Sequence, residues 1–365
     1  MIKLFLCGDV MTGRGVDQIL PHPNPGGIHE SCTQNARAYV ELAEQLCGPI
    51  SSPVGFSYVW GDALAELERI APDARIINLE TSVTGSETYW KGKEVHYRMH
   101  PDNVACLTCA RIDVCVLANN HVLDYGRTGL LETVDTLRSA GLKTAGAGRN
   151  LAEARQPATL GMPGGGTLFV FAFASASSGV PASWAAGKQR AGVNFVREIS
   201  EAQAAEIAQL LQQVKSSGDL AIASVHWGSN WGFAVSSEQI RFAHALIEAG
   251  FDVVHGHSSH HVRPIEVYGN KLVLYGCGDF IDDYEGITGY EAFRDDLVLM
   301  YFPTLAAENG ELMELRMTPM QIRRMKLNRA SSDDTSWLRD TLQRISTEFG
   351  TRVDLANDGT LVLSI

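Results

Sequence analysis

Short, continuous runs of apolar residues alternate along this chain with longer segments in which apolar residues recur at helical spacing. The short runs indicate strands buried on both faces, at residues 3–7, 75–77, 114–117, 168–172, 220–225, 253–254, 265–268 and 271–274. Helices are expected at residues 61–70, 129–140, 201–215 and 237–249. This alternation predicts a layered α/β fold in which helices cover the faces of the sheets.

The middle and the end of the chain suggest how these elements are divided. Pro163, which is followed by three glycines, predicts a turn before the strand at residues 168–172 and the start of a second half of the fold. Beyond Arg294, strand-like runs at 296–302 and 312–317 and a helix near 334–348 carry no clustered chemical groups. We therefore expect a main domain over residues 1–302 and a structural extension over residues 303–365 that packs on it.

Composition narrows the class of protein. A chain of 365 residues that is 45% hydrophobic can bury a large core. Its formal net charge of −12 argues against nucleic acid or an anionic membrane surface as a partner. The apolar run before Gly8 is too short for a signal peptide or a membrane span, so we expect a cytoplasmic protein without direct membrane insertion.

Polar residues with metal-ligand chemistry follow the apolar runs at the points where the strands are expected to end. They are Asp9, Asn78, Glu80, Asn120, His121, His226, His255, His257, His260 and His261. Open α/β sheets bind ligands just beyond the carboxyl ends of their strands. Because carboxylate, amide and imidazole groups are the ligand types of a two-metal hydrolytic centre, we expect the functional site at this rim.

Two of these clusters are the most informative. Four histidines lie within residues 255–261, directly after an expected strand, and imidazole suits zinc, manganese, iron and nickel alike. Asn120 offers a neutral oxygen ligand, and the adjacent His121 can donate or accept a proton near neutral pH. Asp124, three residues later, could orient that imidazole. We therefore expect His121 and Asp124 to be catalytic.

These same motifs resemble those of the CapA family of poly-γ-glutamate capsule proteins. The matching strings are Gly8-Asp9-Val10-Met11, Asn78-Leu79-Glu80, Ala118-Asn119-Asn120-His121, His226-Trp227-Gly228, Gly256-His257 with His260, and Tyr275-Gly276-Cys277-Gly278-Asp279-Phe280. Residues 13–22, 97–103 and 276–286 look like a branch that includes polyglutamine synthesis accessory proteins. The family is in turn similar to calcineurin-like metallophosphatases. This resemblance implies a four-layer αββα double β-sandwich.

The resemblance also implies roles for individual side chains around one or two divalent transition metals, manganese, iron or zinc. Asp9 and His260 match ligands of the first metal, Glu80 matches the carboxylate that bridges both metals, and Asn120, His226 and His257 match ligands of the second metal. His121 matches the general acid.

The sequence departs from the phosphatase pattern in ways that bear on the first metal. Met11 stands where that pattern has a histidine, and Asn78-Leu79-Glu80 replaces the usual Gly-Asp pair. The closing motif is also lengthened between His257 and His260. These changes indicate that one of the two metal sites could be lost. Phosphate esters should then be turned over poorly, because hydrolysis of these esters uses paired ions to stabilise the attacking and the leaving oxygens.

The expected function is that of a metal-dependent enzyme acting on the carbonyl of a glutamyl polymer or peptide in biosynthesis of a capsule or cell-wall polymer, together with polymer synthase proteins. Arg14 and Arg98 are candidates for gripping a substrate carboxylate, or equally for surface ion pairs. Trp227 is a candidate wall of the pocket, or a core aromatic. Alternative functions are a metallophosphoesterase, a peptide Cα epimerase like the lasso-peptide epimerases, and a non-catalytic polymer-binding accessory protein.

Overall fold

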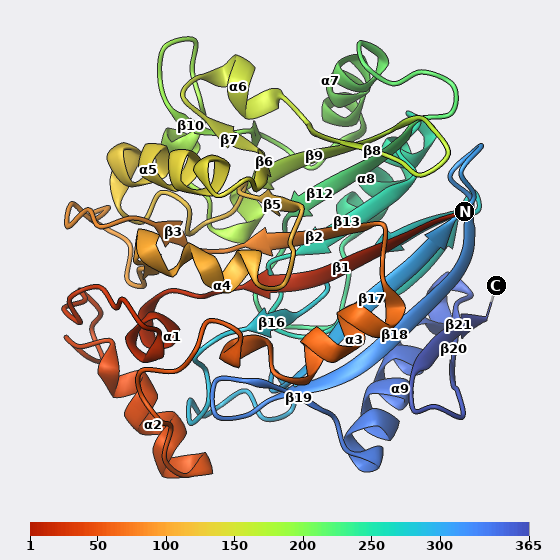
Figure 1. The fold of residues 1–365 in the computed structure, drawn as a ribbon. Helices are drawn as coiled ribbons and strands as arrows, with labels where there is room; N and C mark the ends of the chain where they lie inside the picture. Colours follow the sequence, from red (N-terminus) through yellow and green to blue (C-terminus); the bar gives the residue numbers. More distant parts are fainter. Residues whose placement is uncertain (365) are drawn as a thin grey trace.

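The first large sheet is built around β1 (Ile2–Val10), a strand that is buried along almost its whole length. The computed structural model describes residues 1–364, and in it β1 lies between parallel β2 (Ala74–Leu79) and antiparallel β17 (Leu297–Leu305) (Figure 1). The strand order is β20-β21-β18-β17-β1-β2-β5-β6. The remaining strands of this path are β5 (Val114–Val116), β6 (Lys143–Ala145), β18 (Leu312–Ile322), β20 (Arg352–Leu355) and β21 (Leu361–Ser364). In addition, β16 (Asp279–Ile281) pairs with β1, and β19 (Leu327–Arg329) pairs with β18.

The second large sheet has the order β11-β9-β12-β13-β15-β14, and β8 pairs with β9 as an antiparallel hairpin. Its strands are β8 (Ala158–Gly161), β9 (Thr167–Ser175), β11 (Phe195–Val196), β12 (Leu220–His226), β13 (Val253–His257), β14 (Ile265–Tyr268) and β15 (Lys271–Leu274). Parallel β12 and β13 end in register at His226 and His257. Two small sheets pair β3 (Ser82–Val83) with β4 (Arg98–Met99) and β7 (Ala147–Gly148) with β10 (Gly192–Val193).

Helices surround the sheets, and some of them cover the outer faces of the two large ones. They are α1 (Arg14–Ile19), α2 (Arg37–Cys47), α3 (Asp62–Ile70), α4 (Ala105–Thr108), α5 (Gly126–Ser139), α6 (Leu151–Arg155), α7 (Glu201–Gln212), α8 (Ser237–Glu248) and α9 (Ser332–Ser346). Short 3-10 turns occur at Tyr58–Trp60, Pro101–Val104, Ala176–Ser178, Ala182–Trp184 and Thr347–Phe349. In Figure 1, α3 lies in front of β17 and β18. Helices α7 and α8 pack on the second sheet, which completes the expected αββα order.

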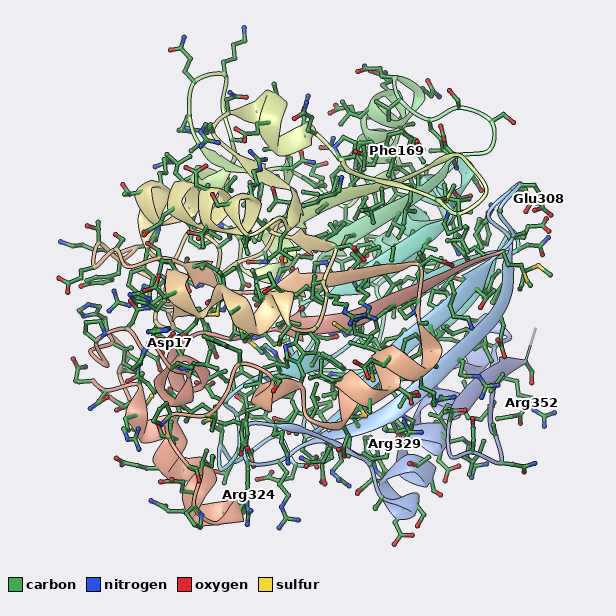
Figure 2. All side chains as sticks on the ribbon, in the orientation of Figure 1. Asp17, Phe169, Glu308, Arg324, Arg329 and Arg352 are labelled. Atoms are coloured by element: carbon green, nitrogen blue, oxygen red, sulfur yellow. The ribbon has the colours of Figure 1, made fainter. Side chains whose placement is uncertain are left out.

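The alternation of side chains along β12 shows how the second sheet uses its two faces. Leu220 and Ile222 belong to the large core shared with the first sheet, whereas Ala221, Ala223 and Val225 pack against α7 and α8. Because side chains alternate with a period of two, Ser224 and His226 also point toward the first sheet. Figure 2 shows side chains filling the space between the ribbons, with Arg324 and Arg352 near the edge of the molecule in this view. His226 therefore lies between the two sheets, at the carboxyl end of β12.

All of the strands and helices predicted from the apolar pattern are present, with ends that differ by a few residues. The turn at Pro163 joins β8 to β9, and β8 is the first strand of the second sheet along the chain. In the C-terminal region, β18 pairs with β17 and β21 pairs with β18. Among residues 1–364, no helix has both the length and the apolar character needed to cross a membrane.

Candidate metal centre

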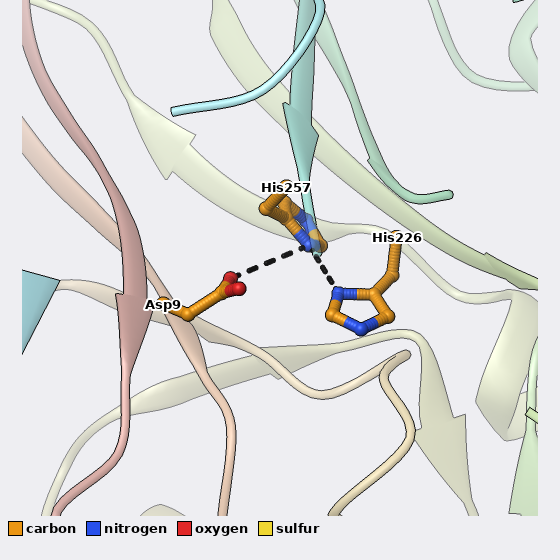
Figure 3. Close-up of side chains that lie close together, drawn as sticks. All are labelled: Asp9, His226 and His257. Atoms are coloured by element: carbon orange, nitrogen blue, oxygen red, sulfur yellow. Dashed lines mark hydrogen bonds and ion pairs between the residues drawn. The ribbon is translucent and has the colours of Figure 1, made fainter. Parts of the chain in front are cut away.

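The first candidate ligand group joins the two large sheets. Asp9 comes from β1, whereas His226 and His257 end β12 and β13, and ligand atoms of the three lie within 4.8 Å of one another (Figure 3). His226 Nδ1 is 2.7 Å from His257 Nδ1, and His257 Nδ1 is 3.9 Å from Asp9 Oδ1. Two ring nitrogens at this distance share at most one proton, so a bound cation satisfies both lone pairs better than a proton does.

Neighbouring side chains hold these two imidazoles in place. Ser224 Oγ is 2.8 Å from His257 Nε2, and Asn120 Oδ1 is 3.0 Å from His226 Nε2. Partners on the outer nitrogens leave both Nδ1 atoms facing the centre, which is how protein sites orient histidine ligands. The structure therefore brings Asn120 to the same group of residues as His226 and His257.

A second candidate ligand group shares Asp9 with the first. Asp9, His260 and Asp279 have ligand atoms within 4.8 Å of one another, and His260 Nδ1 is 2.9 Å from Asp279 Oδ1. Asp9 and Asp279 face each other in the register of β1 and β16. Asp279 Oδ2 is buried and has no hydrogen-bond partner among the described residues. A buried carboxylate oxygen without a partner is costly, and a metal ion would satisfy it.

Asp279 was not predicted as a site residue. The sequence does contain a signal for it, because Gly278-Asp279 repeats the Gly8-Asp9 pair a few residues after an apolar run. Of the other histidines in the 255–261 cluster, His255 bonds the carbonyl of Cys7 at 2.7 Å, and His261 packs on Phe293 and Trp231. Neither His255 nor His261 belongs to a ligand group.

Glu80 faces Asp9 across Asn78. Asn78 Nδ2 donates to Asp9 Oδ1 at 2.7 Å and to Glu80 Oε2 at 3.3 Å, and Asn119 Nδ2 donates to Asn78 Oδ1 at 3.0 Å. Burial is the largest cause that raises the pKa of both Asp9 and Glu80, and the nearby Asp9 carboxylate raises the pKa of Glu80 further. Such a cluster of buried carboxylates becomes favourable when a cation neutralises it.

The carboxylate common to the two candidate ligand groups is not the one that the family resemblance implies as the bridge between the metals. Asp9 is common to both groups, whereas Glu80 belongs to neither. Glu80 Oε1 lies instead 3.7 Å from His121 Nε2 and 3.8 Å from His226 Nε2. The mixed carboxylate and imidazole donors fit one or two divalent transition metals, with Asp9 between the two positions.

His121 is oriented by a network that the sequence did not reveal in full. Its Nδ1 is 2.6 Å from Asp124 Oδ2, which also accepts from the Tyr97 amide at 2.7 Å. Lys93 Nζ bonds the Asp124 carboxylate and the Asn120 carbonyl and lies 2.9 Å from His121 Nδ1. Lys93 sits in a polar loop without a recognisable motif, so nothing in its local sequence pointed to this role.

The charges in this network favour a neutral His121 and an ionised Asp124. Burial lowers the pKa of His121 to about 4, although Asp124 opposes the shift. Burial raises the pKa of Asp124, but His121 and Lys93 together lower it below its ordinary value. With Nδ1–H donating to Asp124, the lone pair of Nε2 faces Glu80 and the metal ligands.

The two arginines expected to bind substrate have other partners. Arg14 donates through Nε to Asp283 at 2.8 Å and through Nη1 to Glu30 at 3.3 Å, and it is buried. Arg98 donates to the carbonyls of Ser86 and Pro25. The two carboxylates correct the expected role of Arg14, because its guanidinium is already paired inside the protein. The role of Arg98 stays a prediction, because its guanidinium bonds backbone carbonyls and forms no ion pair among the described residues.

Trp227, the expected wall of the pocket, is likewise a core residue and does not line the centre. It packs with Phe242 and Tyr275, and its indole donates to the Tyr275 carbonyl at 2.9 Å. The physical reason is the strand period, since Trp227 follows Val225 by two residues and shares its side of the sheet.

Substitution of Asp279 tests the second ligand group. We expect Asp279→Asn to weaken manganese binding by about 10- to 100-fold, because the amide removes an anionic ligand from a buried group. Equilibrium dialysis followed by elemental analysis measures the change, and Asp340→Asn on the exposed side of α9 is the matched control. Unchanged affinity and stoichiometry would exclude Asp279 as a ligand.

Comparisons with known proteins identify the family of this chain. The 5'-nucleotidase precursor of Thermus thermophilus aligns with a TM-score of 0.46 and 12% identity over 88% of this chain and 54% of its own. The probable polyglutamine synthesis accessory protein of Mycobacterium tuberculosis (strain H37Rv) is 49% identical over 363 residues, 99% of this chain and 95% of that protein. The PGA biosynthesis protein CapA of Bacillus subtilis (strain 168) is 28% identical over 225 residues, 61% of this chain and 56% of its own. Residues 3–284 match the model of the family described as bacterial capsule synthesis protein PGA_cap, and the chain belongs to that family.

Proposed function

We propose that this protein is a metal-dependent enzyme that acts on amide carbonyls of a glutamyl polymer or peptide in poly-glutamate biosynthesis. The observation that carries this proposal is the pair of ligand groups sharing Asp9, with His121 beside them. The names of its relatives, for polyglutamine synthesis and PGA biosynthesis, supply the substrate class. We further infer that it acts in the cytoplasm together with a polymer synthase, as the word accessory in the relative's name suggests.

Asp9, His260 and Asp279 would hold the first manganese, iron or zinc ion, and Asp9, His226 and His257 would hold the second. When bound, such an ion supplies Lewis acidity at the carbonyl. Asn78 and the backbone amide of Ser258 keep the Asp9 carboxylate oriented, through bonds of 2.7 Å and 3.2 Å to its two oxygens.

His121 would move the proton. Its Nε2 faces the ligand cluster and would accept a proton from the water whose oxygen adds to the amide carbonyl, and Asp124 would stabilise the imidazolium that results. The same Nε2 would then give this proton to the departing amine as the C–N bond breaks. Lys93 keeps Asp124 ionised and in place, so that the network sets both the tautomer and the direction of transfer.

Phosphate esters are the less suitable substrates. Met11 occupies the position of a phosphatase histidine, and its thioether lies fully buried beside the Tyr284 hydroxyl at 3.9 Å. Phosphoryl transfer depends on paired ions that stabilise both the attacking and the leaving oxygens, so a weakened ligand set impairs it most.

The test is a substrate comparison with metal-loaded protein. We expect release of amine from poly-γ-glutamate or γ-glutamyl peptides, loss of this release with a chelator, and recovery when manganese is added back. A panel of phosphate esters is assayed in parallel. If the panel reaches a kcat/KM of about 10⁴ M⁻¹s⁻¹ while glutamyl peptides are neither bound nor cleaved, a phosphoesterase replaces the proposed activity.

A further inference from the structure

Arg263 is a buried arginine whose charge is not neutralised by the protein. Its side chain donates from Nη1 to the carbonyl of Ala234 at 3.2 Å and from Nη2 to the carbonyl and hydroxyl oxygens of Ser229 at 2.7 and 3.0 Å. Arg263 is 3% exposed, its Nε has no hydrogen-bond partner, and no carboxylate among residues 1–364 forms an ion pair with it. Burial lowers its pKa to about 10. Arg14, by contrast, is buried against two carboxylates.

A cavity of about 610 Å³ lies against this guanidinium. Its wall includes Gln239, whose Nε2 is also buried without a hydrogen-bond partner among the described residues. A Cβ atom placed on Gly228 would lie 2.9 Å from Gln239 Nε2 and 3.6 Å from Arg263 Nη1. Both nitrogen donors therefore lie close to the Gly228 backbone, which has no side chain to keep them apart.

The start of α8 adds to the positive character of this space. Ser236 caps α8 and lines the cavity, and the free amide groups of a helix N-terminus favour a negative charge. Two acidic residues also line the cavity, Glu198 and Glu238, and both are exposed to solvent. The unpaired nitrogen donors of Arg263 and Gln239 are buried, whereas the charges of the two acids are screened by water. The interior of the cavity therefore favours an anion.

The cavity adjoins the metal centre. Gly228 follows the ligand His226 by two residues, and its carbonyl accepts from Ser258 Oγ at 3.4 Å. The backbone amide of that same serine donates to Asp9 Oδ2 at 3.2 Å. On the other side, Ser177 Oγ accepts from the Gly228 amide at 2.9 Å. Gly228 and Ser258 therefore link the wall of the cavity to the candidate ligand Asp9 through two hydrogen bonds.

From these contacts we infer that the Arg263 cavity binds a carboxylate of the glutamyl unit next to the amide that reacts. The inference rests on the proposed function for the identity of the substrate. A guanidinium and an amide donor match the two oxygens of a carboxylate, and the absence of a counter-ion among the described residues leaves that position for the ligand. Each unit of a glutamyl polymer carries such a group, so this contact would select the polymer and set its register.

Gln239→Glu tests the inference with almost no change of shape. Gln239 Oε1 accepts from the Ser236 amide at 3.3 Å within the capping box, and glutamate can accept the same bond. The new carboxylate removes the Nε2 donor and gives Arg263 an internal counter-ion. We expect the variant to bind glutarate, used as the probe, roughly tenfold or more weakly than the wild type, as loss of a charged hydrogen bond predicts.

Calorimetry on the full chain with metal removed by chelator measures this binding independently of catalysis. Gln212→Glu, at the exposed end of α7, makes the same chemical change away from the cavity and should leave the affinity for glutarate unaltered. Neutral glutaramide should fail to bind the wild type, a comparison that needs no variant to fold. Circular dichroism checks that Gln239→Glu is folded.

Different outcomes separate this inference from the proposed function. Equal glutarate affinity in the wild type and Gln239→Glu, or equal affinity of the wild type for glutarate and glutaramide, would overturn the carboxylate site. Tighter binding of inorganic phosphate than of glutarate would also overturn it. If glutarate binding behaves as expected but glutamyl peptides are never cleaved, the site stands and the catalytic proposal fails. If the wild type and Gln239→Glu cleave glutamyl peptides with the same KM, the catalytic proposal stands and the carboxylate site fails.

Discussion

His121→Ala is expected to lower kcat on a glutamyl substrate by about 10²- to 10⁴-fold, the usual contribution of a general acid–base group. In the proposed mechanism the proton is accepted by its Nε2, which lies 3.7 Å from Glu80 Oε1, and alanine offers no replacement. Metal content should remain that of the wild type, because His121 belongs to neither ligand group. Steady-state kinetics and elemental analysis on the same preparations measure both quantities.

His244→Ala is the matched control for this variant, since His244 lies on α8, stacks on Tyr268 and bonds Glu266 away from the centre. Asp124→Asn provides a second, more conservative test. It keeps the size of the side chain but removes the charge that stabilises the imidazolium. Turnover at the wild-type rate in His121→Ala would show that the imidazole only supports the fold of this loop.

Arg14→Met should lower the free energy of unfolding by about 3–5 kcal/mol, the typical result of removing one partner from a buried ion pair. The substitution leaves Asp283 and Glu30 buried without their cation, and the pair links α1 to the segment after β16. It also removes the guanidinium from the face of Tyr39, whose ring centroid lies 3.6 Å away. Urea unfolding followed by circular dichroism measures the loss.

Arg149→Met is the control, because Arg149 forms ion pairs with Asp135 and Glu153 while about half of its side chain is exposed. Exposed pairs of this kind contribute about 0–1 kcal/mol. Adding Asp283→Asn to Arg14→Met should recover part of the loss, since it removes one of the unpaired charges. A loss below about 1 kcal/mol for Arg14→Met would contradict a structural role for this pair.

The sequence by itself determined the layered fold and the place of the site. A short buried strand can be recognised from a continuous run of apolar residues, such as the runs before Asp9 and His226, because such a run is a local property of the sequence. Parallel strands carry their carboxyl ends to one edge, so the polar residues that follow them could be expected to meet there. The structure brings Asp9, Asn120, His226, His257 and His260 together as that reasoning predicted.

Only the tertiary structure decided how these groups and their neighbours are used. Asp9 belongs to both candidate ligand groups because β1 has two kinds of neighbour. It packs against β13 of the second sheet and pairs with β16 of its own sheet, and the second contact brings Asp279 to the centre. Residues remote in sequence also decide whether a buried arginine is neutralised. Arg14 forms an ion pair with Asp283, whereas Arg263 has no carboxylate partner among the described residues. The physical reason is that local sequence sets the periodicity and ends of an element, but the partners and charge of a buried side chain depend on packing between distant segments.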